Sequence, residues 1–221
     1  MFATSLPMTV AEAKSPELAI IDYGMGNLRS VERALVAVGG AVRLVDAPDQ
    51  VGAAKALVFP GQGAIVDAMA RLRDKGWDNF IRHWILRDQP FFGICLGLQA
   101  LFEQSEEGHT GGLGILGGSV RRFSFGNGSG IKVPHMGWNT VEFADADDLL
   151  VDIPMTSSHF YFVHSYYVVP EDKRLIWGRT CYGGLTFCSA IRRGNLFATQ
   201  FHPEKSQQVG LRLYRNFVRS L

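Results

Sequence analysis

The sequence lacks the features that mark secreted, membrane and nucleic-acid-binding proteins. Its three cysteines, Cys95, Cys181 and Cys188, are widely spaced, a pattern that favours neither a disulfide framework nor a CxxC zinc site. No run approaches the roughly 18 apolar residues that cross a bilayer. The 22 basic residues are balanced by 21 acidic ones, which gives no charged surface for nucleic acid. We therefore expect a cytoplasmic protein that acts on a small metabolite or binds a protein partner.

The composition that is present is that of a globular protein. Hydrophobic residues make up 47% of the 221 residues and charged residues 19%, enough apolar material for a sizeable core. No internal repeat or low-complexity linker divides the chain. We expect one domain over residues 17–221. Residues 1–16, which have neither the charged start nor the apolar core of a signal peptide, are expected to be a flexible extension.

The first half of the chain alternates between short apolar runs and segments with helical spacing. Strands are expected at residues 18–22, 41–45, 56–59 and 90–94, and helices at residues 27–38, in a region that ends near residue 87, and at residues 96–104. An alternation of strands and helices is typical of a parallel sheet with helices on both faces.

The second half has more glycine, valine and aromatic residues. Strand-like segments lie at residues 120–125, 138–143, 161–169, 174–180, 185–191 and 196–200, and a last helix is expected at residues 206–219. This pattern predicts antiparallel hairpins added to the sheet. The predicted fold class is therefore α/β, with a mostly parallel central sheet flanked by helices and antiparallel hairpins in the second half.

Cys95 lies in the strongest single motif of the sequence. An apolar run leads into Gly93-Ile94-Cys95-Leu96-Gly97, and a helix is expected to begin at once. This is the thiol version of a nucleophile elbow, where glycines leave room for a sharp turn and for neighbouring chains. The amides that follow favour a thiolate and can bind an oxyanion. A lone cysteine is more often a packing residue, as we expect for Cys181 and Cys188, but strand, glycines and helix together favour a nucleophile here.

His202 is the best placed of the six histidines to serve a thiol nucleophile. It follows the strand expected at residues 196–200, so it also belongs at the carboxyl end of a strand. Glu204 can orient the ring and stabilise an imidazolium, and Pro203 stiffens the connection between them. The same His-Pro-Glu run is also typical of a helix start. The cysteine elbow far upstream favours the catalytic interpretation.

Several segments together resemble a known family. The elbow, the distant His-x-Glu and the loop Pro60-Gly61-Gln62-Gly63 are similar to those of class I glutamine amidotransferases. Four more segments are similar to the glutaminase subunits of imidazole glycerol phosphate synthase: residues 21–30 (IDYGMGNLRS), 132–139 (KVPHMGWN), 161–166 (YFVHSY) and 200–206 (QFHPEKS). The resemblance covers roughly residues 18–220, and Pro-His-Met-Gly-Trp-Asn is its most discriminating part. It implies the class I amidotransferase fold.

The resemblance also implies a reaction and a partner. Cys95 would attack the side-chain amide of L-glutamine, His202 would protonate the leaving ammonia and then activate water, and Glu204 would orient His202. No metal or organic cofactor is implied. The ammonia would pass to a cyclase subunit, HisF, a (β/α)8 barrel that completes a heterodimer. That subunit makes imidazole glycerol phosphate and aminoimidazole carboxamide ribotide in histidine biosynthesis.

Further site residues rest on the resemblance alone. It implies backbone oxyanion donors in Gly61, Gln62, Gly63 and Leu96, glutamine contacts from Gln99, His164, Ser165 and Tyr166, and cyclase contacts from Met136, Trp138, Tyr161 and Lys205. Gln62 and Ile65 stand where the family commonly has valine and phenylalanine. Without the resemblance, Pro-Gly-Gln-Gly is an ordinary turn, Trp138 and Tyr161 are core aromatics, and Lys205 is a solvated helix residue.

Three alternative functions keep parts of this pattern. The glutaminase subunit of another class I amidotransferase, such as anthranilate synthase, would retain Cys95, His202 and Glu204 but supply another acceptor. The Pro-His-Met-Gly-Trp-Asn segment argues against it. A non-catalytic regulatory module is disfavoured by the intact Cys-His-Glu set, and a thiol protease of similar fold is disfavoured by the match to the glutamine site.

Overall fold

The structure, a computed structural model, describes residues 17–126 and 128–221, so the expected extension over residues 1–16 lies outside the described residues. The strands are β1 (Glu17–Ile21), β2 (Ala41–Val45), β3 (Ala56–Gly61), β4 (Phe91–Cys95), β5 (Phe102–Ser105), β6 (Thr110–Gly111), β7 (Leu116–Arg122), β8 (His135–Phe143), β9 (Ser158–His164), β10 (Tyr166–Pro170), β11 (Ile176–Tyr182), β12 (Leu185–Arg193) and β13 (Leu196–Thr199). The helices are α1 (Leu28–Ala37), α2 (Ile65–Asp74), α3 (Trp77–Leu86), α4 (Leu96–Gln99) and α5 (Gln207–Arg219), and the 3-10 turn η5 (Pro203–Lys205) precedes α5. None of the described helices is long and apolar enough to cross a bilayer.

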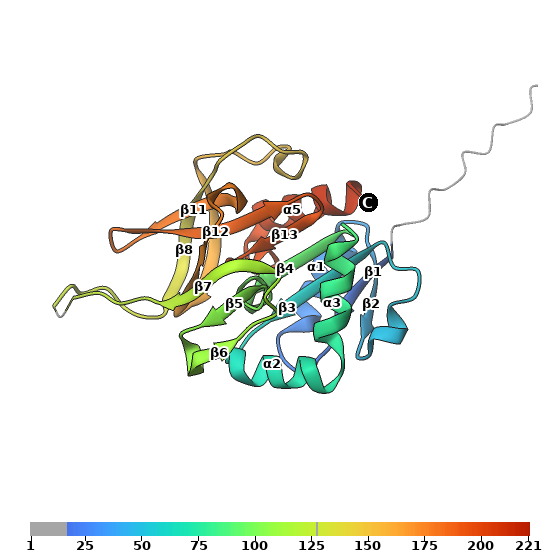
Figure 1. Cartoon of the computed structure of the whole chain (residues 1–221). Helices are drawn as coiled ribbons and strands as arrows, with labels where there is room; N and C mark the ends of the chain where they lie inside the picture. The colour runs from blue at the N-terminus through green and yellow to red at the C-terminus, as the bar shows by residue number, and fades with distance from the viewer. Residues whose placement is uncertain (1–16, 127) are drawn as a thin grey trace, which may run out of the picture.

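One sheet runs through the molecule in the order β2-β1-β3-β4-β13-β12-β10-β7-β5-β6 (Figure 1). From β2 to β13 all neighbouring strands are parallel. From β13 to β7 they are antiparallel, and β11 and the β8–β9 hairpin extend this second part from β12. The predicted parallel sheet with antiparallel additions in the second half is confirmed.

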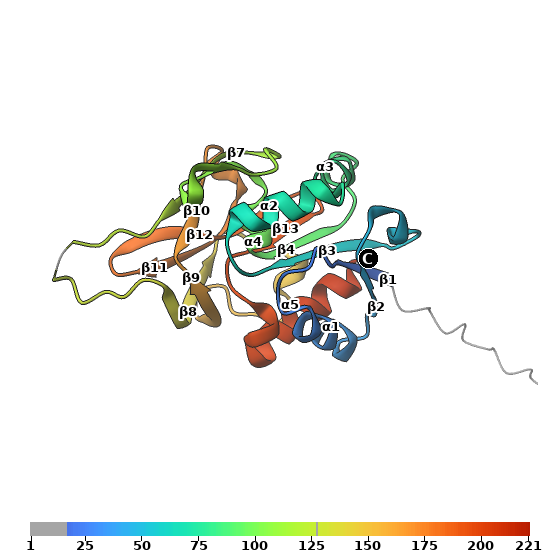
Figure 2. The same cartoon turned by 90° about the horizontal axis from the view of Figure 1, so that it is seen from below.

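Two pairs of helices cover opposite faces of the parallel part, α2 with α3 and α1 with α5 (Figure 2). A strand between two covered faces is apolar on both sides. In β1, Ala19 and Ile21 pack with the core under α2 and α3, whereas Leu18 and Ile20 pack with the core under α1 and α5. This double burial explains why the first strands stand out in the sequence as continuous apolar runs.

Two expected helices differ from the structure. The helical region expected to end near residue 87 is two helices, because Gly76 breaks it with a left-handed φ of 75°. The helix expected at residues 96–104 ends at Gln99, and residues 102–105 form β5 instead. The carbonyls of Ala100, Leu101 and Phe102 accept hydrogen bonds from the backbone of residues 113–116. Tertiary partners thus satisfy carbonyls that a longer helix would have used.

The segment expected as one strand over residues 161–169 is two strands that separate at Ser165. β9 pairs with β8, whereas β10 pairs with β7 and β12 of the main sheet. The chain therefore leaves the β8–β9 hairpin and enters the main sheet at Ser165. The strand expected at residues 120–125 lies earlier, at Leu116–Arg122.

Candidate active site

Cys95 closes β4, and the chain turns sharply into α4 at this residue. Its φ of 55° lies in the left-handed region, which is strained for a residue with a side chain. Close backbone neighbours explain the glycines: a Cβ at Gly97 would overlap the carbonyl oxygen of Phe59 in β3, and one at Gly93 would lie 2.9 Å from the carbonyl oxygen of Gly97 in α4. The structure thus has the elbow geometry that the sequence predicts, with the thiol at the carboxyl edge of the parallel sheet.

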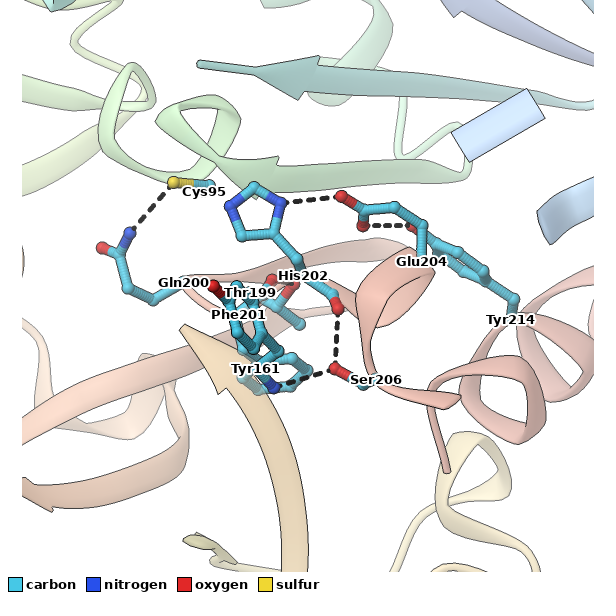
Figure 3. A network of polar contacts seen from close by, with 9 residues as sticks. All are labelled: Cys95, Tyr161, Thr199, Gln200, Phe201, His202, Glu204, Ser206 and Tyr214. Carbon is cyan, nitrogen blue, oxygen red and sulfur yellow. Dashed lines mark hydrogen bonds and ion pairs between the residues drawn. The ribbon is translucent and has the colours of Figure 1, made fainter. Parts of the chain in front are cut away.

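His202 and Glu204 lie beside this thiol because β13 is the parallel neighbour of β4. His202 Nδ1 is 2.7 Å from Glu204 Oε1, and both side chains are 2% exposed. The other ring nitrogen, Nε2, is buried and makes no hydrogen bond to the described residues. It lies on the side of the ring that faces Cys95 (Figure 3). The arrangement leaves one nitrogen anchored and the other free for proton transfer.

The charge of His202 reflects a competition between burial and its neighbours. Burial disfavours the charged ring and would lower its pKa, but the negative charge of Cys95 and the hydrogen-bonded carboxylate of Glu204 raise the pKa to about 10. His202 is therefore protonated near neutral pH. A protonated ring can act first as the acid that protonates a leaving group.

The turn that carries His202 is held by hydrogen bonds to β9 and α5. Ser206 Oγ donates to the His202 carbonyl at 2.6 Å and accepts from the Tyr161 amide at 3.0 Å, and the His202 amide donates to the Tyr161 carbonyl at 2.9 Å. On α5, the Tyr214 hydroxyl donates to Glu204 Oε2 at 3.4 Å. These bonds, drawn in part in Figure 3, fix the imidazole relative to the β8–β9 hairpin.

A cavity of about 450 Å³ opens onto Cys95. All four residues expected to contact glutamine line it: Gln99, His164, Ser165 and Tyr166. Three of the four expected oxyanion residues, Gln62, Gly63 and Leu96, line it too, whereas Gly61 pairs with Cys95 in the ladder between β3 and β4. The structure therefore brings the residues implied by the resemblance around one cavity.

Gln99 has its amide nitrogen engaged and its oxygen free. Nε2 donates to the Tyr166 carbonyl at 3.0 Å and to Gln200 Oε1 at 3.1 Å. No described residue donates to Gln99 Oε1. A ligand in the cavity would therefore meet Gln99 as an acceptor, which suits an ammonium group better than a carboxylate.

A chain of hydrogen bonds fixes His164 as a neutral ring. His164 Nδ1 donates to the Tyr166 carbonyl at 2.7 Å, so its Nε2 accepts from His135 Nδ1 at 3.0 Å. His135 Nε2 then accepts from Asn139 Nδ2, which also donates to the Cys181 carbonyl. Burial lowers the pKa of His135 to about 4 and that of His164 to about 3. Neither ring adds charge to the cavity at neutral pH.

Sequence reasoning missed two residues near the site. Glu107 lines the cavity and accepts a hydrogen bond from the Ile65 amide at 3.0 Å, but in the sequence it is one of three glutamates in residues 103–107 with nothing to single it out. Tyr23 is buried against Gly61, and its hydroxyl has no partner among the described residues. Burial and the nearby Cys95 raise the pKa of Tyr23, so the hydroxyl stays protonated.

The residues expected at a cyclase contact lie together on the β8–β9 hairpin and η5. Met136 is 66% exposed and Trp138 47% exposed, although both are large and apolar. The Trp138 and Tyr161 rings lie 6.1 Å apart, and Lys205 Nζ lies 5.8 Å from the Tyr161 ring centre. Trp138 is therefore not the core residue that a structural role would require. Lys205 also reaches the wall of the cavity.

The described residues contain no group of three or more histidine, cysteine, aspartate or glutamate side chains arranged to hold a metal ion. The three cysteines are free, and Cys181 is exposed whereas Cys95 and Cys188 are buried. Burial raises the pKa of Cys188 to about 12, so it is a neutral packing thiol.

Known proteins share both the sequence and the fold. Residues 19–221 match the family model of glutamine amidotransferase class-I. The imidazole glycerol phosphate synthase subunit HisH of Thermosynechococcus vestitus is 50% identical over 204 residues, covering 92% of this chain and 97% of that protein. The same-named subunit of Moorella thermoacetica is 51% identical over 201 residues, covering 90% of this chain and 93% of that protein.

Among solved structures, the fold is similar to that of PurLQS from Thermotoga maritima, with a TM-score of 0.73 and 18% identity over 93% of this chain and 99% of that one. A likeness at this identity concerns the fold alone. The chain therefore shares the overall arrangement of its strands and helices with that structure. The chain belongs to the class I glutamine amidotransferase family and, within it, to the HisH subunits.

Proposed function

We propose that the chain is the glutaminase subunit of an imidazole glycerol phosphate synthase, and that Cys95, His202 and Glu204 hydrolyse L-glutamine to glutamate and ammonia. The observation that carries the proposal is the buried Cys95–His202–Glu204 group at the ends of two adjacent parallel strands, opening into a cavity lined by the residues that the family resemblance implies. The intact group also argues against a purely regulatory module.

The steps follow from the protonation states of the resting site. The Cys95 thiolate attacks the amide carbon of glutamine, and protonated His202 gives its Nε2 proton to the nitrogen, so ammonia leaves and a thioester remains. Neutral His202 then takes a proton from water, which attacks the thioester. The C–S bond breaks, the electron pair returns to sulfur, and glutamate leaves. Glu204 holds the ring in place and stabilises its charged form throughout.

The cavity wall matches the two charges of an α-amino acid. Its lining includes one carboxylate, Glu107, and one ammonium, Lys205. The free oxygen of Gln99 adds an acceptor for an ammonium group. The neutral His164 and the residues Ser165 and Tyr166 complete the pocket for the rest of the substrate. We propose these residues as the glutamine-binding set.

The proposed partner is the cyclase subunit HisF, a (β/α)8 barrel that would receive the ammonia in a heterodimer. Met136, Trp138, Tyr161 and Lys205 would contact it. The exposure of Met136 and Trp138 on the β8–β9 hairpin supports this, since large exposed apolar side chains mark interaction surfaces. The reaction products would be imidazole glycerol phosphate and aminoimidazole carboxamide ribotide in histidine biosynthesis. The three free cysteines suit a cytoplasmic location.

We further propose that docking of the liganded partner turns the peptide between Gly61 and Gly63 so that its N–H joins that of Leu96 in an oxyanion hole. Gly63 has a φ of 98°, which residues with a side chain rarely adopt. Glycine can adopt backbone angles that other residues cannot, so the chain at this position has the freedom to turn. Loss of one oxyanion donor typically costs about 10²–10³ in rate. The donor acts on the transition state, so the change belongs mainly in kcat.

The test is steady-state kinetics of glutamine hydrolysis for the free chain, its complex with the cyclase, and the complex with the cyclase's nucleotide ligand. We expect kcat to rise by about 10²–10³ in the liganded complex while KM changes less. Equal kcat in all three states would refute the coupling. Absence of hydrolysis in every state would instead refute the glutaminase function.

A further inference from the structure

Gln200 is a buried amide that the proposed reaction does not use. It follows β13, two residues before His202, and is 0% exposed. Its Nε2 donates to Cys95 Sγ at 3.5 Å. Figure 3 shows the sulfur between this amide and the His202 ring. The nucleophile therefore has a neutral donor on one side and a cationic ring on the other.

The Gln200 amide has one orientation that satisfies its neighbours. Gln99 Nε2 donates to the Tyr166 carbonyl, which can only accept, and this fixes which end of the Gln99 amide is nitrogen. The same nitrogen donates to Gln200 at 3.1 Å, so the Gln200 atom that receives it must be Oε1. The NH2 group of Gln200 must then face Cys95. The donor to the sulfur is thus set by a chain of bonds that begins at the backbone of β10.

We propose that Gln200 is a hydrogen-bond donor to the Cys95 thiolate, with Gln99 as the positioning residue that aims it. The inference rests on the proposed role of Cys95 as nucleophile. A donor to an ionised acceptor makes a stronger hydrogen bond than a donor to a neutral one. Gln200 therefore favours the thiolate over the thiol before attack. It also favours return of the electron pair to sulfur when the thioester breaks down.

The groups around the sulfur make a clear readout possible, because Gln200 itself does not titrate. The His202 ring faces the sulfur from the turn after β13, with Glu204 on the far side of the ring (Figure 3). Tyr23 lies nearby after β1, where burial keeps it neutral. On the cavity side, His164 is neutral near pH 7, and Glu107 and Lys205 also line the cavity. These groups stay in place when Gln200 is changed. A shift in the pH dependence of Cys95 reactivity would therefore report the lost donor.

The experiment is alkylation of the free chain by iodoacetamide, without glutamine, over a range of pH, with each cysteine quantified by peptide mass spectrometry. Exposed Cys181 is the reference thiol in the same molecule. Gln200→Met keeps the length of the side chain and removes the donor. We expect its Cys95 to react about tenfold more slowly on the acid side of the pH profile, with the midpoint of that profile moved to higher pH. We expect kcat for glutamine hydrolysis to fall by a similar factor, with KM nearly unchanged.

Two further variants make the result decisive even if Gln200→Met folds poorly. Gln200→Glu has the same shape and still accepts from Gln99, but it puts a carboxylate against the sulfur. We therefore expect its Cys95 to be alkylated more slowly than that of the unchanged chain. The difference should narrow in acid, where the carboxylate is protonated. Thr199→Val is the matched control, because it removes a buried hydrogen bond to the Phe201 carbonyl one residue away without touching Cys95.

The inference is overturned if iodoacetamide alkylates Cys95 as fast in both Gln200 variants as in Thr199→Val. A different result would overturn the assignment of Cys95 as the nucleophile. In that case Cys95 of the unchanged chain would react no faster near neutral pH than the exposed Cys181. The two failures are distinguished within one set of peptide maps.

Discussion

The turn that carries His202 and the β8–β9 hairpin share hydrogen bonds but differ in how they meet solvent. Around Cys95 the ionisable side chains are buried, and each has a fixed partner or a neighbouring charge. On the hairpin, Met136 and Trp138 expose much of their apolar surface. A buried charged group makes strong interactions at a high cost if a partner is removed. An exposed apolar group contributes little until something covers it. Changes in the first region should therefore affect the chemistry, and changes in the second should affect its regulation.

Cys95→Ala should show the largest effect on the catalytic side. It removes the only thiol on an elbow in the described chain, so we expect glutamine hydrolysis to fall to background. The liganded complex should still form product from added ammonium salt, because that step belongs to the proposed cyclase site. Both activities can be measured on one preparation of the complex. Glutamine hydrolysis that persists in Cys95→Ala would contradict the assignment.

His202→Ala should come next, with a loss of roughly a hundredfold or more in kcat, because it removes the acid and the base together. Glu204→Ala should cost less, since Glu204 acts through the ring. It should also lower the pKa of His202, because the protonated ring loses an opposite charge and a hydrogen bond. The alkaline limb of the profile of kcat/KM against pH should then move to lower pH. If Glu204→Ala has a lower kcat than His202→Ala, the roles assigned to these two residues are wrong.

Trp138→Ala tests the other side of the comparison. Truncating a central aromatic at an interface commonly costs about 2 kcal/mol or more, so we expect the apparent Kd for the cyclase to rise at least about tenfold. Basal hydrolysis by the free chain should stay within about twofold. Leu86→Ala is the matched control, because Leu86 is 70% exposed at the end of α3, away from the hairpin. If Trp138→Ala and Leu86→Ala change the Kd for the cyclase equally, the hairpin is not part of the interface.

His135 tests how the two regions are joined, and its effect should be the smallest. Burial lowers the pKa of His135 and His164, so between about pH 6.5 and their folded values the unfolded chain binds more protons than the folded one. The contribution of these two histidines to stability should be fully present above about pH 6.5 and should be lost as the pH falls toward their folded pKa values. Each such histidine contributes up to about 1.4 kcal/mol per pH unit in that window.

Replacing His135 by glutamine should reduce this acid sensitivity, as measured by urea unfolding near pH 7 and pH 5. His109→Gln is the control at an exposed histidine. If the two variants lose stability equally on acidification, the buried histidine pair is not the source of the effect.

The sequence predicts the parallel half of the fold well because its strands are buried on both faces and appear as apolar runs. It predicts α4 and β5 poorly, since residues 100–102 have helical character but their carbonyls bond to residues 113–116. No local pattern contains that information. The same distinction holds for the site. The elbow at Cys95 and the His202–Glu204 pair are local motifs, whereas Glu107, Tyr23 and Gln200 acquire a role only when distant elements meet.

Ser165, where the chain passes from β9 to β10, has a mechanical consequence. The β8–β9 hairpin is joined to the main sheet by the short ladder between β8 and β11 and by the backbone of this residue, and between these points Tyr161 is hydrogen-bonded to the His202 turn. A load applied near Trp138 is therefore expected to act on the His202 turn through Tyr161 and on the cavity through Ser165. Its two neighbours, His164 and Tyr166, form part of the cavity wall. Bending of the hairpin is therefore expected to change the cavity and the position of the His202 turn together.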